Sequence, residues 1–220
     1  MQTTMLAALA TLLGLLAAPA AAQILDPDDV ELADVVEVQR LGRDLLAYAG
    51  SGSGRVLERL ELNEEVLSQA AEGRIGLVLT DRRALAVSPG FPWSEARYRF
   101  TEKREDGGLI GDRIALVVTS QRLLGYNAGI GSWQDEGIGP GEEIRDTQLG
   151  PSTAVVVTGR RAIGMSPNSG GFVDIDLRVH EKLERISTRS GVATVTTSQR
   201  VLIFQGANAR WVVQRRKINE

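Results

Sequence analysis

The sequence of 220 residues contains no cysteine and a single histidine. Without cysteine, disulfide bonds and a lipid carried on a processed cysteine are both excluded. A zinc centre or a histidine-activated nucleophile would lack the residues it needs, so no metal and no cofactor is expected. The formal net charge is only −3, with acidic and basic residues mixed, and no basic field indicates a nucleic-acid partner.

An apolar stretch opens the chain, from residue 5 to residue 18, and three alanines follow Pro19. This pattern predicts a signal peptide over residues 1–22 with cleavage before Gln23, although the first four residues carry no Lys or Arg. An unprocessed apolar anchor is the alternative. The stretch is short for a membrane span, so we expect no span after cleavage and a secreted or periplasmic protein.

The most regular feature of the chain is the pattern Val-x-Thr-x-x-Arg, which occurs four times at a spacing of 39 residues. Its polar residues are Thr80 and Arg83, Thr119 and Arg122, Thr158 and Arg161, and Thr197 and Arg200. A fixed period of this length is typical of propellers and solenoids.

A fifth, weaker unit precedes these four. Leu46 and Tyr48 occupy its apolar positions, but Asp44 stands where the arginine would be. A large ring follows the threonine by 13 or 14 residues in the other units, namely Trp93, Trp133, Phe172 and Trp211. Residues 23–220 thus hold five units, at about 30–68, 69–107, 108–146, 147–185 and 186–220.

Each unit alternates short apolar runs with glycine-containing turns, a pattern that predicts three or four strands and leaves no room for a helix. In the third unit we expect strands at 114–119 and 123–126, one opening at Trp133, and a fourth at 144–149. Residues 56–71 have helix-forming composition, but the repeat predicts strands there as well. The predicted fold is an all-β, five-bladed β-propeller that closes into a ring.

The segment 200–204, followed by Gly206 and Trp211, resembles the blades of pyrroloquinoline-quinone-type bacterial propellers. The alanine and threonine-glycine signature of those repeats is absent, so the resemblance implies a fold and no quinone site. Five short blades are also similar in size to tachylectin-type lectins. A rival resemblance, over residues 79–83, is to bacterial pleckstrin-homology-like domains.

The repeated polar residues have two interpretations. In the structural one, which we favour, the threonine hydroxyl satisfies the turn and the arginine pairs with a carboxylate next door. Such an exposed pair contributes about 0–1 kcal/mol, so Arg122→Ala should be mild. In the other, four guanidinium groups form an anion-binding ring, which Asp44 would interrupt. The large rings should hold structure, and Trp133→Ala should cost about 3–5 kcal/mol if that ring is fully buried.

Catalytic candidates are sparse. Asp174 and Asp176 alternate on one strand face, but no further oxygen ligands stand near them, and His180 is expected in a loop. We predict an exported, non-catalytic binding or protein-interaction module for an unknown protein or glycan. The alternative is a small carbohydrate-active hydrolase with carboxylates at the axial channel. Its candidates are Glu31, Asp34, Asp106, Asp112, Asp146 and Glu184.

Overall fold

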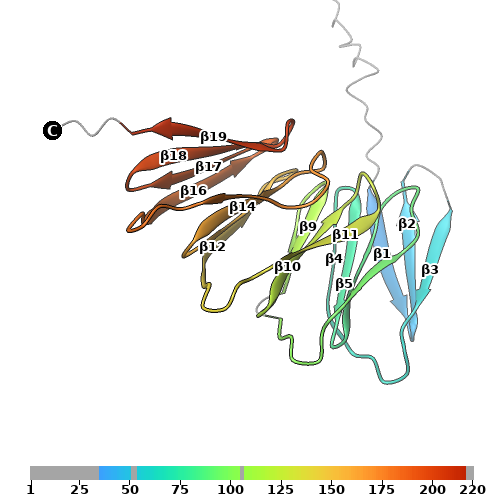
Figure 1. Ribbon diagram of the computed structural model, residues 1–220. Coiled ribbons are helices and arrows are strands. Elements are labelled where there is room, and N and C mark those ends of the chain that lie inside the picture. The colour runs from blue at the N-terminus through green and yellow to red at the C-terminus, as the bar shows by residue number, and fades with distance from the viewer. Residues whose placement is uncertain (1–34, 51–53, 105–106, 217–220) are drawn as a thin grey trace, which may run out of the picture. The chain divides into compact units, whose positions relative to one another are not determined.

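The computed structural model describes residues 35–50, 54–104 and 107–216. Within these ranges the regular elements are antiparallel strands arranged in five sheets (Figure 1). The described residues include no helix long and apolar enough to cross a membrane. The predicted signal peptide lies outside them.

The first sheet has three strands, and each later sheet has four that follow one another in chain order. The first contains β1 (Val36–Leu41), β2 (Asp44–Ala49) and β3 (Arg55–Arg59). The second contains β4 (Val66–Glu72), β5 (Ile75–Thr80), β6 (Arg83–Val87) and β7 (Ser94–Arg97). The third contains β8 (Leu109–Ile110), β9 (Ile114–Val118), β10 (Arg122–Asn127) and β11 (Ser132–Gly137). The fourth contains β12 (Ile144–Leu149), β13 (Ala154–Thr158), β14 (Arg161–Met165) and β15 (Val173–Asp176). The fifth contains β16 (Leu183–Arg189), β17 (Val192–Thr197), β18 (Arg200–Gln205) and β19 (Arg210–Arg215).

The prediction of an all-β chain of five blade-like sheets is confirmed, including strands rather than a helix within 56–71. One strand assignment was wrong: residues 144–149 form β12, the first strand of the fourth sheet, because they pair with β13. The unit limits 68/69, 146/147 and 185/186 fall inside β4, β12 and β16, so the sheets begin a few residues before the counted units.

The core lies between successive sheets. The two central strands of the second sheet, β5 and β6, are buried along their whole length, as continuous apolar runs predict. Four apolar clusters join the first sheet to the second, the second to the third, the third to the fourth and the fourth to the fifth. The predicted packing set lies in these clusters: Val78, Leu85, Val117, Leu124, Val156, Ile163, Val195 and Leu202.

No such cluster joins the first and fifth sheets among the described residues, so closure of the ring stays a prediction. The junctions that are present use a regular fit of small against large residues. A Cβ on Gly164 would lie 2.7 Å from the ring of Phe204, and one on Gly125 would overlap Met165. In both cases the large residue follows the glycine by 40 positions, so the third and fourth sheets each accept a bulky side chain from the next.

Candidate functional site

Each repeated threonine ends or directly follows the second strand of its sheet, and each repeated arginine begins the third. In the third sheet the Thr119 hydroxyl accepts the backbone N–H of Arg122 at 3.0 Å, and the other three units have the same bond. The threonine therefore closes the tight turn, and the arginine leaves it at a fixed position. The tight spacing of three residues follows from this turn.

Each arginine has one buried glutamate partner at an equivalent place, which sequence reasoning missed. Arg83, Arg122, Arg161 and Arg200 bond through Nε to Glu64, Glu102, Glu142 and Glu181, at 2.8, 2.9, 2.9 and 2.9 Å. These glutamates precede the threonine by 16, 17, 16 and 16 residues, so a second periodic signal was present but irregular by one position. We call each glutamate, threonine and arginine set a clamp.

The clamp fastens two successive sheets. Arginine Nη2 donates to the backbone carbonyl of the last residue in the preceding sheet's outer strand, at 2.6–3.1 Å. Those acceptors are Arg59, Arg97, Gly137 and Asp176. Asp44, at the equivalent position of the first sheet, instead contacts Arg59 of the neighbouring strand β3 at 3.5 Å.

The clamps are buried, which corrects the expectation of exposed pairs. The arginine side chains are 5–16% exposed and the glutamate side chains 0–4%. Burial by itself would raise the pKa of Glu64, but hydrogen bonds from Arg83 and from the Glu61 backbone lower it to about 2. The pKa values of Glu102, Glu142 and Glu181 are lowered for the same reasons. The four guanidinium groups are thus occupied inside the protein and do not converge on an open anion site.

Each clamp glutamate also ends a four-residue turn that connects one sheet to the next. Its N–H bonds to the carbonyl three residues earlier, and its carboxylate accepts the N–H of that same residue, as Glu181 does with Arg178 at 3.0 and 2.7 Å. The third turn position has positive φ in Asn63, Gly141 and His180. His180 therefore lies in a loop, as expected.

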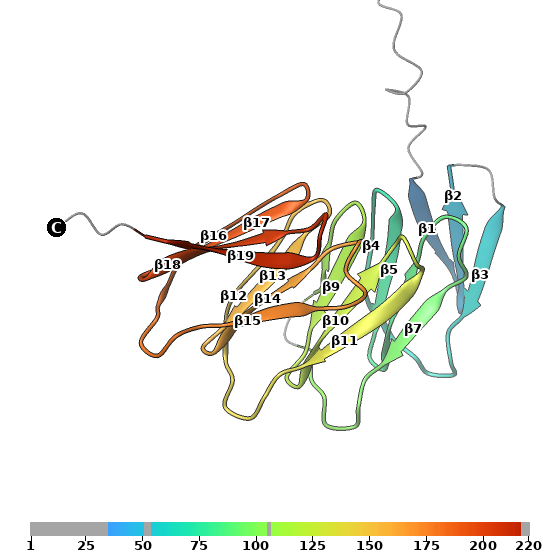
Figure 2. The same ribbon diagram turned by 45° about the horizontal axis from the view of Figure 1, so that its top comes forward.

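The second position of these turns points away from the protein. It holds an apolar side chain in all four connections: Leu62, Phe100, Pro140 and Val179. Leu62 is 69% exposed, Val179 is 80% exposed and Phe100 is fully exposed. We call these four residues the tips. Figure 2 shows the four connections at one end of the strands. The turns between the second and third strands, which hold the clamp threonines and arginines, lie at the same end.

The predicted aromatic positions contact the preceding sheet. The indole N–H groups of Trp93, Trp133 and Trp211 donate to the carbonyls of Val56, Ser94 and Val173, at 3.3, 3.1 and 2.9 Å. Phe172, which has no such donor, packs in the cluster between the third and fourth sheets. The Trp133 ring is only half-buried, so the condition for a loss of about 3–5 kcal/mol is not met.

The acidic candidates are dispersed. Asp174 pairs with Arg161 at 3.2 Å, Glu184 pairs with Arg216 at 2.5 Å, and Asp146 accepts the N–H of Thr147. Asp176 is exposed, and Asp112 lies against Gly73. Glu31, Asp34 and Asp106 lie outside the described residues. Within the described ranges, no group of three or more His, Cys, Asp or Glu could hold a metal ion.

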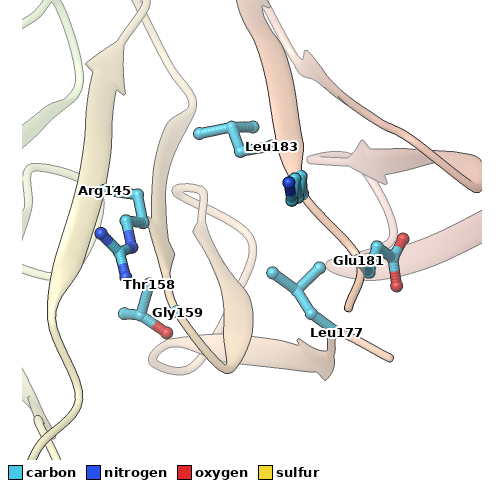
Figure 3. A pocket seen from close by; sticks show the side chains of 7 residues that line it. Arg145, Thr158, Gly159, Leu177, Glu181 and Leu183 are labelled. Atoms are coloured by element: carbon cyan, nitrogen blue, oxygen red, sulfur yellow. The ribbon is translucent and has the colours of Figure 1, made fainter. Parts of the chain in front are cut away.

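A cleft of about 470 Å³ opens beside the tips, between the fourth and fifth sheets (Figure 3). Arg145, Thr158 and Gly159 line one side of it, and Leu177 and Leu183 lie across from them. Glu181 and Lys182 complete the lining. The tips and this cleft form the candidate binding face.

No protein-family model and no curated protein matches the sequence. Solved structures resemble the chain at low identity and low TM-score. YCF48 bound to D1 peptide is 15% identical, with a TM-score of 0.33, over 83% of this chain and 67% of that one. The WD40 domain of SCAP from fission yeast is 10% identical, with a TM-score of 0.33, over 84% and 52%. Apo AztD from Citrobacter koseri is 10% identical, with a TM-score of 0.39, over 82% and 59%. The chain therefore spans about half to two thirds of their lengths, and no role is taken from the likeness.

Proposed function

We propose that this chain is a non-catalytic protein-interaction module that binds its partner through the tips and the adjoining cleft. The observation that carries the proposal is the exposure of Leu62, Phe100, Pro140 and Val179 at one equivalent turn position in four successive connections. Repeat proteins use such equivalent positions to build extended binding surfaces.

The clamps support this role because they fix the turns before a partner arrives. Each turn is held by a backbone bond, a glutamate cap and a buried ion pair. A preorganised surface loses less conformational entropy on binding than a flexible one. The direction of the pKa shifts also argues against hydrolysis at this face, since a general acid needs a raised carboxyl pKa and those of the clamp glutamates are lowered.

The tips can be tested directly. We expect a peptide library displayed against residues 23–220 to yield binders, and the double substitution Phe100→Ser and Val179→Ser to weaken them about tenfold, because two exposed apolar anchors are lost. Ile130→Ser is the matched control, since Ile130 is 47% exposed in a loop that joins β10 to β11, at the opposite end of the sheets. Equal losses in the control, or a library that yields no binder, would contradict the proposal.

We also propose that the protein acts after export, in the periplasm or outside the cell. The support is the apolar stretch at residues 5–18 and the small residues that precede Gln23. Intact-mass measurement of the exported protein should give a chain that begins at Gln23. A mass that retains Met1 would overturn the predicted cleavage.

A further inference from the structure

The cleft between the fourth and fifth sheets has a cation on each wall. Arg145 lies where the pairing of β12 with β13 shifts register, between Ile144 and Asp146. A β-bulge of this kind redirects one side chain out of the regular alternation. The equivalent shifted positions in the second and fifth sheets hold Leu67 and Glu184, so the fourth sheet alone among these three places a cation here.

Lys182, which directly precedes β16, also lines the cleft and is exposed. No bond from its ammonium group to another described residue is present, and the exposed cations Arg160 and Arg178 flank the same edge, likewise without side-chain partners in the described chain. Arg145 makes one exposed contact of 3.4 Å, with Glu143. The cleft therefore has basic groups that an incoming anion can reach.

The acids near the cleft do not cancel this charge. The Glu181 carboxylate is fully buried and already paired with Arg200, and it also accepts the hydroxyl of Thr197. Glu184 pairs with Arg216. Glu143 is 73% exposed and shares Arg145 with solvent, so a ligand can displace it at small cost.

Two leucines give the cleft an apolar part. Leu177 and Leu183 are half-buried, and both side chains lie across the cleft from Arg145 in Figure 3. A ligand that matches these walls must carry an anionic group beside an apolar one. Successive side chains of an extended peptide point to opposite faces, so an acidic residue and its apolar neighbour can face the two walls of the cleft.

We propose that this cleft binds an acidic side chain together with a neighbouring apolar side chain of an extended peptide. The inference rests on the proposed function, and it specifies the chemistry of the partner by charge complementarity. A broad anionic membrane surface fits less well, because the formal charge of the whole chain is −3 and long-range attraction to such a surface is weak.

The test uses fluorescence anisotropy with two labelled peptides, one alternating aspartate with leucine and one alternating asparagine with leucine. The aspartate peptide should bind residues 23–220 about tenfold more tightly, and raising the salt from about 0.05 to 0.5 M should remove most of that preference. Arg145→Ser with Lys182→Ser should weaken the aspartate peptide about tenfold and leave the asparagine peptide unchanged. The control is Arg55→Ser with Arg189→Ser. It removes two exposed cations at the ends of β3 and β16 that lie away from the tips and the cleft.

The outcomes separate the two proposals. Equal binding of both peptides, or equal losses in the cleft and control variants, would overturn the acidic-peptide inference and leave the interaction module standing. Binding to phosphatidylglycerol vesicles but to neither peptide would also overturn it. A peptide library that yields no binder to the unaltered protein would instead contradict the proposed function itself.

Discussion

Glu181→Ala is expected to lower the free energy of unfolding by about 3–5 kcal/mol, because it leaves the Arg200 guanidinium buried without its counter-ion. The Glu181 side chain is 0% exposed and that of Arg200 is 9% exposed. The substitution also removes the acceptor of the Arg178 N–H, which opens the turn between the fourth and fifth sheets. Urea unfolding followed by tryptophan fluorescence measures the loss.

Two further variants isolate the ion pair. Glu143→Ala removes an exposed partner of Arg145 and should cost less than about 1 kcal/mol. In a double-mutant cycle, Glu181→Ala combined with Arg200→Ala should be less destabilising than the sum of the single changes, since neither charge is then left unpaired. Additive losses would mean that the clamp contributes through packing alone.

The position of each clamp arginine was predictable from the sequence, but the energetic importance of its ion pair was not. A spacing of three residues from threonine indicates one tight turn, so both residues could be placed at a hairpin end. The partner lies in a different turn, and the residues before Glu64, Glu102, Glu142 and Glu181 are Asn, Thr, Gly and His. Because those neighbours share no type and the spacing is irregular by one position, the periodic signal of the glutamates was missed, and the pair was taken as exposed.

Atypical residues in the terminal units also become interpretable only in the structure. Ile203 occupies the position of Gly125 and Gly164, which accept a bulky residue from the following sheet. Glycine at this repeat position makes room for a side chain of the next sheet, a role that the repeat pattern alone does not reveal. The cleft depended on both a register shift at Arg145 and the approach of β16, and neither is visible in sequence.

Acidification below about pH 4.5 is expected to destabilise the fold steeply, because the pKa values of the four clamp glutamates are lower in the folded state than in the unfolded chain. A group with a lowered folded-state pKa stabilises fully above its unfolded pKa, and this contribution is lost as pH falls toward the folded value. For Glu64 that window runs from 4.5 to about 2. Its share is about 3 kcal/mol, and the other three act in the same direction.

Urea unfolding at a series of pH values from about 6 down to 2.5 tests this linkage. Glu64→Gln should lower stability at pH 6 and flatten the decline at acid pH, because the amide has no proton to gain. Glu143→Gln, at a carboxylate that is 73% exposed, should leave the slope unchanged. A decline as steep in Glu64→Gln as in the unaltered protein would show that acid unfolding begins elsewhere and that the clamps do not govern it.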